Sequence, residues 1–239
     1  MITAQQIKEK LFSLADERKK SVIMSFFKTG KGDYSEGDIF LGVTVPRQRK
    51  IVNAYQEMPL TELQMLLHEP FHECRMTALL FLIKMFKQSE KQDLRDYYFG
   101  FYCSNIQFVN NWDLVDCSAP IVVGEYMLSQ KDISLLKQWA LYGNLWQQRI
   151  AIVATLAFIR VSNFDVTFSM AEILLNHNHD LIQKAVGWML REVGKRDDNA
   201  EYTFLIKNVR YKKMPRTMLR YAIERFPESI RQNFLKGVL

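Results

Sequence analysis

Helical periodicity runs through almost the whole chain, and it constrains the possible fold more than any other feature. Along many segments apolar residues recur at i, i+3, i+4 and i+7, the spacing of one face of an α-helix. Only 10 Gly and 6 Pro interrupt 239 residues, and no convincing β-hairpin signal occurs. We therefore expect an all-α protein. The expected helices lie near residues 3–28, 46–57, 60–68, 71–87, 90–102, 111–129, 131–141, 144–160, 164–176, 179–195, 198–208, 214–226 and 228–236.

The order of these helices indicates a repeat architecture. Helices of moderate length follow one another in pairs with short connections, which is typical of stacked helical hairpins of the HEAT type. We therefore expect residues 1–239 to form a single HEAT-like repeat domain, a curved α-solenoid of antiparallel helix pairs. No fixed motif recurs, so an ordinary globular helix bundle is the alternative. A solenoid would create a long concave surface, and such a surface is shaped to receive a duplex.

Positive charge is concentrated in the last quarter of the chain. Residues 184–239 carry 13 Lys and Arg against 6 Asp and Glu, whereas residues 1–183 carry 19 against 20. The net charge of +6 therefore comes entirely from the C-terminal region. A localised basic region suggests a polyanionic partner, with nucleic acid as the leading candidate. Charge alone does not separate this interpretation from a solvated basic face that binds nothing.

Cysteine and histidine spacing argues against a disulfide framework and a metal site. Cys74, Cys103 and Cys117 are odd in number and form no C-x-x-C pair, which favours a reducing compartment. His177 and His179 in "LNHNHD" have no obvious third ligand, so we expect a loop there. The N-terminus is amphipathic, and the chain has no run of about 18 apolar residues. We expect a monomeric cytoplasmic protein, nucleoid-associated when bound to DNA, with no membrane contact, metal or cofactor.

The segment "IQKAVGWMLREVGK" (182–195) places a tryptophan among cations. With about 100° of rotation per residue, Lys184, Trp188, Arg191 and Lys195 fall within an arc of about 60°, opposite an apolar face. In one interpretation the tryptophan packs against a neighbouring helix and the long cationic side chains cover it. In the other it is an aromatic plate in a basic groove, suited to contact a nucleotide. The three cations are then candidates for DNA binding.

The stretch "NNWDLVDCSAP" (110–120) pairs a tryptophan with acids. If it is helical, Trp112 and Asp116 are separated by four residues and share a face, while Asp113 lies about 100° away. One interpretation makes Asp113 or Asp116 a helix cap or ion-pair partner and buries Trp112 in the core. The sharper one is a catalytic carboxylate beside an aromatic wall. Such a carboxylate can stabilise positive charge developing on a sugar and orient a water molecule, and aromatic faces attract cations.

Further basic residues are placed where they could hold a DNA backbone. "VPRQRKI" puts Arg47 and Arg49 after a loop with Gly42, whose nearby amides, together with Thr44, could bind phosphate. The alternative is a solvated basic first turn. Arg149 precedes the apolar segment "AIVATLAFI" and must reach solvent, a carboxylate or a phosphate, because an unpaired buried arginine is costly. A last basic cluster, expected to contact the DNA backbone without sequence preference, comprises Arg210, Lys212, Lys213 and Arg216.

Five blocks of sequence together resemble the AlkD-type DNA alkylation repair glycosylases, a family built from HEAT-like repeats. In chain order they read "GDIFLGVTVPRQRKI", "NWDLVD", "NLWQQR", "IQKAVGWMLRE" and "MPRTMLRYAIE", and they extend from about residue 38 to residue 226. The resemblance implies a concave, basic, all-helical surface that holds double-stranded DNA. It also implies base excision repair by hydrolysis of the N-glycosidic bond of cationic N3- and N7-alkylated purines, such as 7-methylguanine.

The resemblance also implies roles for individual residues. The family's catalytic aspartate matches Asp116. The other matches are the active-site tryptophans Trp112 and Trp188, the active-site arginine Arg149, and a DNA-contacting arginine, Arg191. One departure is Asn111, where some members carry a second tryptophan, and this affects the expected wall of the pocket.

The implied chemistry agrees with the residues. An alkylated purine departs as a neutral base, so little acid assistance is needed, and the motifs contain no evident general acid. Asp116 would stabilise the oxocarbenium-like sugar and position water, as one carboxylate does in glycoside hydrolysis. No lysine is placed as a Schiff-base nucleophile, so we expect base excision without strand cleavage. The alternative is a non-catalytic HEAT-like scaffold that binds nucleic acid or protein. A carboxylate facing a polyphosphate groove favours the enzyme.

Overall fold

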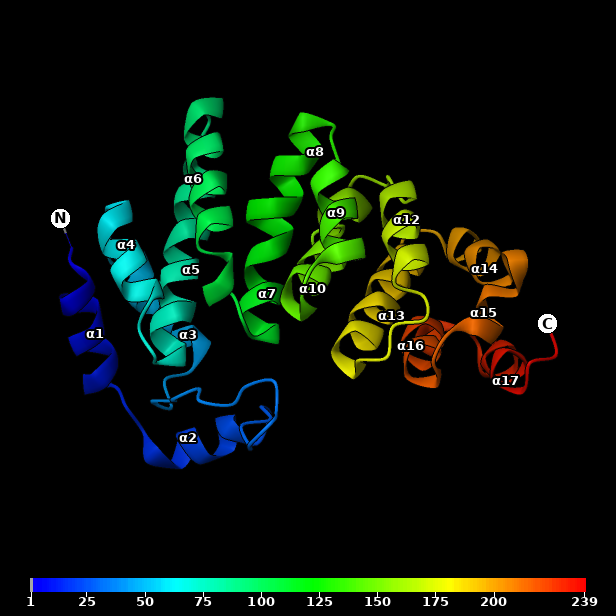
Figure 1. Cartoon of the computed structure of the whole chain (residues 1–239), viewed down its shortest axis with the longest axis horizontal. Coiled ribbons are helices and arrows are strands. Elements are labelled where there is room, and N and C mark those ends of the chain that lie inside the picture. Colours follow the sequence, from blue (N-terminus) through cyan, green and yellow to red (C-terminus); the bar gives the residue numbers. More distant parts are fainter. Residues whose placement is uncertain (1) are drawn as a thin grey trace. The chain divides into compact units, whose positions relative to one another are not determined.

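Every regular element of the structure is a helix (Figure 1). The computed structural model describes residues 2–239, and in that range the only β-type pairing is an isolated bridge between Ile39 and Phe71. The all-α prediction is therefore confirmed. Within the same range no helix is both long enough and apolar enough to cross a bilayer. The chain divides into two compact units, Met1–Ser118 and Ala119–Leu239.

The first unit is built around one long buried helix, α5 (His72–Gln88). From His72 to Phe86 every residue except Lys84 is buried, so this helix is packed on all sides. Helices on several sides of it contribute to its burial, among them α3, α4 and α7. The other elements of the unit are α1 (Ala4–Ser13), α2 (Glu17–Met24), α3 (Val45–Asn53), α4 (Leu60–Leu67), α6 (Gln92–Ser104), η1 (Ile106–Phe108) and α7 (Trp112–Ser118).

The second unit consists of shorter helices that pair along the chain. Helix α9 (Ser134–Tyr142) packs on α10 (Leu145–Val153), and only Gly143 and Asn144 join them, as in a helical hairpin. Such pairs of neighbouring helices are typical of an α-solenoid. The other elements are η2 (Ala119–Glu125), α8 (Tyr126–Gln130), α11 (Leu156–Arg160), α12 (Asp165–Ile173), α13 (Asp180–Gly194), α14 (Asp198–Ile206), η3 (Lys207–Val209), α15 (Arg210–Lys213), α16 (Arg216–Ala222), η4 (Ile223–Arg225) and α17 (Glu228–Lys236).

The close approach of α13 and α16 in the second unit requires a glycine. A Cβ atom added to Gly187 would lie 2.4 Å from the carbonyl oxygen of Met218 and 2.5 Å from the Cβ of Tyr221. No side chain fits in that space, so the two helix backbones pack directly against each other. The apolar side of α13 is fixed against α16 by this contact.

The expectation of one helix over residues 3–28 is wrong. The structure has two helices there, because Asp16 begins a new one after a break at residues 14–16. The Asp16 carboxylate accepts hydrogen bonds from the amides of Arg18 and Lys19, at 3.1 Å each. Its own amide donates to the carbonyl of Leu41, at 3.0 Å. An acidic cap of this kind ends one helix and starts the next even though the apolar spacing continues.

Two other expected helices are interrupted. Within the expected helix 111–129, residues 112–129 are helical, but residues 119–125 form a π-helix. Pro120 has no N–H group, so it cannot make the α-type hydrogen bond to the carbonyl of Asp116, and the ladder changes there. The segment 144–160 is divided by a turn at residues 154–155. The four-residue helix α15 was not expected from the sequence.

Candidate active site

The first turn of α7 is held by a buried asparagine. Asn111 is completely buried, and its side-chain oxygen accepts a hydrogen bond from the amide of Trp112, at 2.8 Å. Its side-chain nitrogen donates to Ser35 Oγ (2.6 Å) and Asp38 Oδ2 (2.8 Å). Asn111 therefore belongs to the interior. Its contacts fix the position at which the Trp112 side chain leaves the backbone.

Trp112 is half-buried and forms part of a cavity wall. Its ring stacks on Phe27, with centroids 5.3 Å apart and planes inclined by 22°. The cavity has a volume of about 310 Å³ and a mainly apolar surface. Its lining includes Ile23, Phe26, Phe27, Val43, Thr44, Val45, Pro46, His72, Met76, Trp112 and Asp113. Trp112 is thus neither wholly in the core nor wholly exposed.

The two acids of α7 have different surroundings. Asp113 Oδ2 lies 2.8 Å from His72 Nε2, so Asp113 is an ion-pair partner and its partner is a histidine. Asp116 is partly exposed and lies one turn after Trp112 on the same helix. The predicted sharing of a face by Trp112 and Asp116 follows from this helical geometry. Of the two acids, Asp113 is the one that pairs with His72.

The loop around Gly42 holds a protein carboxylate. The amides of Leu41, Gly42 and Val43 donate to the buried carboxylate of Glu73, at 2.9, 2.8 and 3.2 Å. Gly42 has a φ of +85°, and a Cβ there would lie 2.1 Å from the carbonyl oxygen of Asp16. The expectation that amides near Gly42 bind phosphate is therefore wrong for Leu41, Gly42 and Val43, because Glu73 already occupies them.

The side chains after this loop remain DNA-binding predictions. Thr44 precedes α3, makes no capping hydrogen bond, and lines the cavity beside Trp112. Arg47 and Arg49 are exposed on the first turns of α3. Pro46 occupies the first turn of α3, where its missing N–H group costs no helical hydrogen bond. The exposure of Arg47 and Arg49 is compatible with phosphate binding, and equally with a basic first turn that contacts only solvent.

In the second unit, α13 has the two faces that its sequence predicts. Residues such as Ile182, Val186 and Leu190 are buried, whereas Trp188 is only partly buried. The stripe of Lys184, Trp188, Arg191 and Lys195 lies on the other side of the helix, and we call it the cationic face. Trp188 is therefore placed among cations and outside the apolar core of the unit.

Each cation of this face has a carboxylate partner, which the sequence analysis missed. Lys184 Nζ lies 3.0 Å from Asp180, four residues earlier, and Arg191 pairs with Glu224. The remaining acid, Glu192, accepts a hydrogen bond from Trp188 Nε1 (3.0 Å) and pairs with Lys195 Nζ (2.6 Å). The spacing of Asp180 and Glu192 was visible in the sequence, whereas Glu224 comes from a distant segment.

Arg149 is buried near the start of α10. Asn144 and Gln147 form a capping box that starts this helix. Arg149 is only 5% exposed, and its Nη1 donates to the main-chain oxygen of Leu181 at 2.5 Å. A carbonyl acceptor was not among the three partners expected from the sequence. It links α10 to the first turn of α13, which carries the cationic face.

The C-terminal basic cluster is divided by its environment. Lys212 and Lys213 are exposed on α15. Arg216 is exposed at the start of α16, where its Nη1 donates to the carbonyl of Leu235 at 2.6 Å. Arg210 instead pairs with Glu172. The first three residues remain predicted contacts to a DNA backbone, and Arg210 is engaged within the protein.

A sequence profile of the DNA alkylation repair enzyme family matches residues 7–226. The chain belongs to this DNA alkylation repair enzyme family. The matched range contains every residue predicted above to act in catalysis or DNA binding. Repair of alkylated DNA is accordingly the general function that the family assignment supports.

A solved structure supports the same fold. It is described as a predicted DNA alkylation repair enzyme from Enterococcus faecalis, and it superimposes with a TM-score of 0.68. The match covers 90% of this chain and 97% of that chain, with 14% sequence identity. At that identity the likeness shows a shared helical fold, which agrees with the predicted α-solenoid. A comparison with curated proteins returned no match.

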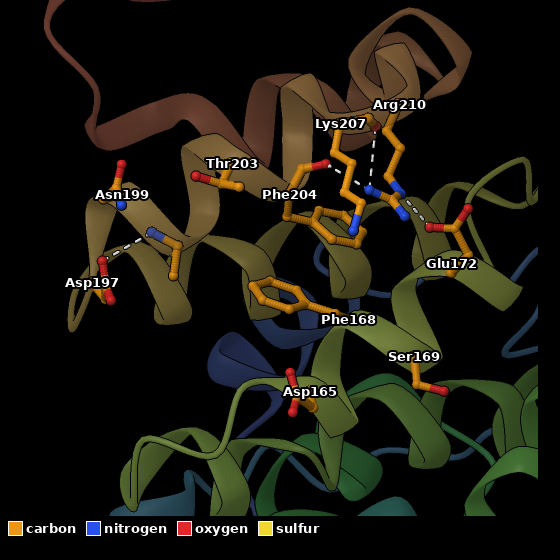
Figure 2. Close-up of a pocket in the computed structure, with 11 residues that line it drawn as sticks. Asp165, Phe168, Ser169, Glu172, Asp197, Asn199, Thr203, Phe204, Lys207 and Arg210 are labelled. Carbon is orange, nitrogen blue, oxygen red and sulfur yellow. Dashed lines mark hydrogen bonds and ion pairs between the residues drawn. The ribbon is translucent and has the colours of Figure 1, made fainter.

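A cavity in the second unit of this repair-family protein is lined by none of the residues predicted to act in catalysis, although Arg210 of the C-terminal basic cluster lies in its wall. It has a volume of about 590 Å³ and lies between α12 and α14 (Figure 2). Phe168 and Phe204 stack there with centroids 4.6 Å apart, and the Arg210 guanidinium lies 4.6 Å from the Phe204 centroid. Arg210 also donates to the main-chain oxygens of Phe204 and Lys207, at 3.2 Å each. Its charge is thus used to join α12, α14 and α15.

Metal ligation has no evident place in the described part of this family member. Among residues 2–239, no group of three or more His, Cys, Asp or Glu side chains is arranged to hold a metal ion. The acidic residues of interest are paired with protein groups. Asp113 pairs with His72, and Glu73 binds main-chain amides.

Proposed function

We propose that this DNA alkylation repair family member is an AlkD-type monofunctional glycosylase. Its substrate would be double-stranded DNA containing cationic N3- or N7-alkylated purines, and the reaction would be hydrolysis of the N-glycosidic bond. The observation that carries this proposal is the first turn and a half of α7. There a partly exposed carboxylate, Asp116, follows a half-buried indole, Trp112, by one helical turn.

The chemistry of the substrate suits this pair. A cationic purine leaves as a neutral base, so the difficult step is the development of positive charge on the deoxyribose. A carboxylate stabilises that charge and orients the attacking water, and the negative face of an indole favours a cation. Asp116 and Trp112 take these two roles. In the proposal Trp188 contacts the lesion nucleotide, and Arg149 binds a phosphate after exchanging the Leu181 carbonyl for DNA.

The remaining predicted contacts are electrostatic. Lys184, Arg191 and Lys195 of the cationic face would contact phosphates after exchanging their carboxylate partners for DNA. We infer that residues 1–239 act as one DNA-binding domain and that one chain suffices. The other proposed phosphate contacts are Thr44, Arg47, Arg49, Lys212, Lys213 and Arg216.

The test is release of 7-methylguanine from methylated duplex DNA by the wild type, by Asp116→Asn, and by a matched control, Asp93→Asn. Asp93 is exposed on α6 and belongs to no proposed contact. We expect Asp116→Asn to lose at least about 100-fold in rate, the control to keep its rate, and the product to be an intact strand with an abasic site.

Two outcomes would contradict the proposal in different ways. Equal release by the wild type and Asp116→Asn would remove Asp116 from the mechanism. DNA binding without release by the wild type would favour a non-catalytic scaffold.

A further inference from the structure

A buried histidine is held between two carboxylates beneath the first turn of α7. The His72 side chain is only 4% exposed. Its Nε2 donates to Asp113 Oδ2 at 2.8 Å, and its Nδ1 lies 3.6 Å from Asp38 Oδ2. The Asp38 carboxylate is itself bound by Arg75 Nη2 at 2.5 Å. His72 therefore joins α5, α7 and the loop at residues 35–38.

His72 is charged at neutral pH. Burial alone would lower the pKa of His72, but the charge of Asp113, the hydrogen bond to Asp113 and the nearby Asp38 carboxylate together raise it to about 9. Arg75, the nearby cation, opposes this increase only in part. An imidazolium has two N–H donors and no acceptor. The hydrogen bond from Nε2 to Asp113 sets the ring orientation, while Nδ1 lies 3.6 Å from Asp38 and makes no hydrogen bond. The cluster consequently has one preferred geometry.

The cluster controls the backbone on both sides of Trp112. On the preceding side, Asn110 accepts a hydrogen bond from Arg75 Nη1 at 2.6 Å, and Asn111 donates to Asp38 at 2.8 Å. On the following side, Asp113 is bound to His72. Asn110, Asn111 and Asp113 thus each make one hydrogen bond to the group formed by His72, Asp38 and Arg75. The position of the Trp112 Cα atom is thereby fixed from two directions.

The cluster also controls the stacking partner of the Trp112 ring. The His72 ring lies against Phe40, at a centroid distance of 4.8 Å and an angle of 25°, and against Phe27, at 5.1 Å. Phe27 in turn stacks on Trp112 at 5.3 Å. His72 therefore reaches the Trp112 indole through one intermediate side chain, Phe27. It also binds Asp113, the residue that follows Trp112 in α7.

We propose that His72 is a positioning residue for Trp112, acting through Asp113 and Phe27. This inference rests on the proposed function to the extent that Trp112 contacts the lesion nucleotide. His72 is almost fully buried and its ring nitrogens face Asp113 and Asp38, so we assign it no direct part in catalysis. A buried ion pair contributes little net stability compared with a packed apolar pair. What the charged cluster provides in addition is orientation, because hydrogen bonds are directional and apolar contacts are not.

The main test removes the charge of His72 and keeps an aromatic ring at that position. His72→Phe retains an aromatic side chain between Phe27 and Phe40 but removes both N–H donors. The double variant His72→Phe/Asp113→Leu also removes the carboxylate that would otherwise be buried alone, so the fold is retained if the single variant is unstable. The control is His68→Phe, because His68 stacks on Phe108 and binds Asn105 but makes no contact with the cluster.

Two measurements are made on each folded variant. The first is 19F NMR of protein labelled with 5-fluorotryptophan, with the Trp112 signal assigned by Trp112→Phe. The second is single-turnover release of 7-methylguanine at saturating enzyme, with duplex affinity measured separately. We expect the Trp112 signal to shift or broaden in the single and double variants. Release should slow by at least about 10-fold, while the Kd for DNA changes by less than about threefold. His68→Phe should behave as the wild type.

The outcomes separate the inference from the proposed function. An unchanged Trp112 signal in the folded double variant would overturn the positioning role of His72. So would an unchanged release rate in that variant. If the wild type releases no base, the glycosylase proposal fails, and the NMR comparison still decides whether His72 positions Trp112.

Discussion

Glu201 gives a prediction whose size follows from its burial. The residue lies on α14 with only 2% of its surface exposed, and its Oε1 makes no hydrogen bond. It packs so closely on α13 that a Cβ on Gly194 would lie 1.8 Å from its Oε2. Burial raises the pKa of Glu201 to about 9, the Arg191 charge lowers it, and Asp198 raises it further. At neutral pH this carboxyl group is therefore protonated in the folded protein.

The raised pKa makes stability depend on pH. The ordinary pKa of a glutamate in the unfolded chain is 4.5, and that of folded Glu201 is about 9. Between these values the unfolded chain releases a proton that the folded protein keeps, so the free energy of unfolding falls as pH rises. Each pH unit corresponds to about 1.4 kcal/mol, so the loss between pH 5 and pH 8 is about 4 kcal/mol. The contribution is fully present below pH 4.5 and is lost as pH rises through about 9.

Glu201→Gln removes the titration and nearly keeps the shape. Urea unfolding of both proteins at pH 5, 6.5 and 8 gives the difference in unfolding free energy at each pH. We expect the variant to gain about 4 kcal/mol relative to the wild type across this range. A constant cost of burying the amide cancels in this comparison, as does the titration of His72, which both proteins share. Glu90→Gln, at an exposed position, serves as the control.

A pH-independent difference would refute this reasoning. It would mean that Glu201 is ionised in the folded protein and compensated by Arg191. The raised pKa would then be wrong, and Glu201 and Arg191 would form a buried ion pair behind the cationic face.

Two further perturbations concern α13. Arg191→Ala should weaken duplex binding and reduce the slope of log affinity against log salt by about 1, as measured by fluorescence anisotropy of a labelled duplex; an unchanged slope would mean that Arg191 touches no phosphate. Gly187→Ala should lower the free energy of unfolding by about 1–3 kcal/mol, because its Cβ would meet the Met218 carbonyl at 2.4 Å. This loss exceeds the gain of about 1 kcal/mol in helix propensity, and a thermal melt equal to that of the wild type would show that the helices do not pack as described.

Local patterns were enough to predict most of the helices. The expected helix 71–87 matches α5 (His72–Gln88), and 179–195 matches α13 (Asp180–Gly194). Both helices have several turns of consistent apolar spacing, so the pattern that predicts each helix lies within its own segment. The two faces of α13 were predictable for the same reason, since periodicity determines which residues share a side of a helix.

The missed features depend on contacts between distant residues. Nothing near Gly42 indicates that its amides would be taken by Glu73, which is 31 positions away. In the same way, the pairing of His72 with Asp113 spans 41 positions. A lone acid or histidine in an apolar helix does indicate that a partner must exist, because a buried charge needs compensation. The sequence pattern cannot identify which group supplies it.

The carboxylates of the cationic face change what its basic residues can contribute. Exposed ion pairs such as Lys184 with Asp180 are worth at most about 1 kcal/mol, so a phosphate can replace the carboxylate at little cost. Glu192 differs, because it binds the Trp188 indole and Lys195 together and is mostly buried. If a phosphate replaced Glu192 as the partner of Lys195, Glu192 would still accept the hydrogen bond from the Trp188 indole. On this argument Lys184 and Arg191 provide affinity for a polyanion, whereas Glu192 keeps the Trp188 ring in one orientation whether or not DNA is bound.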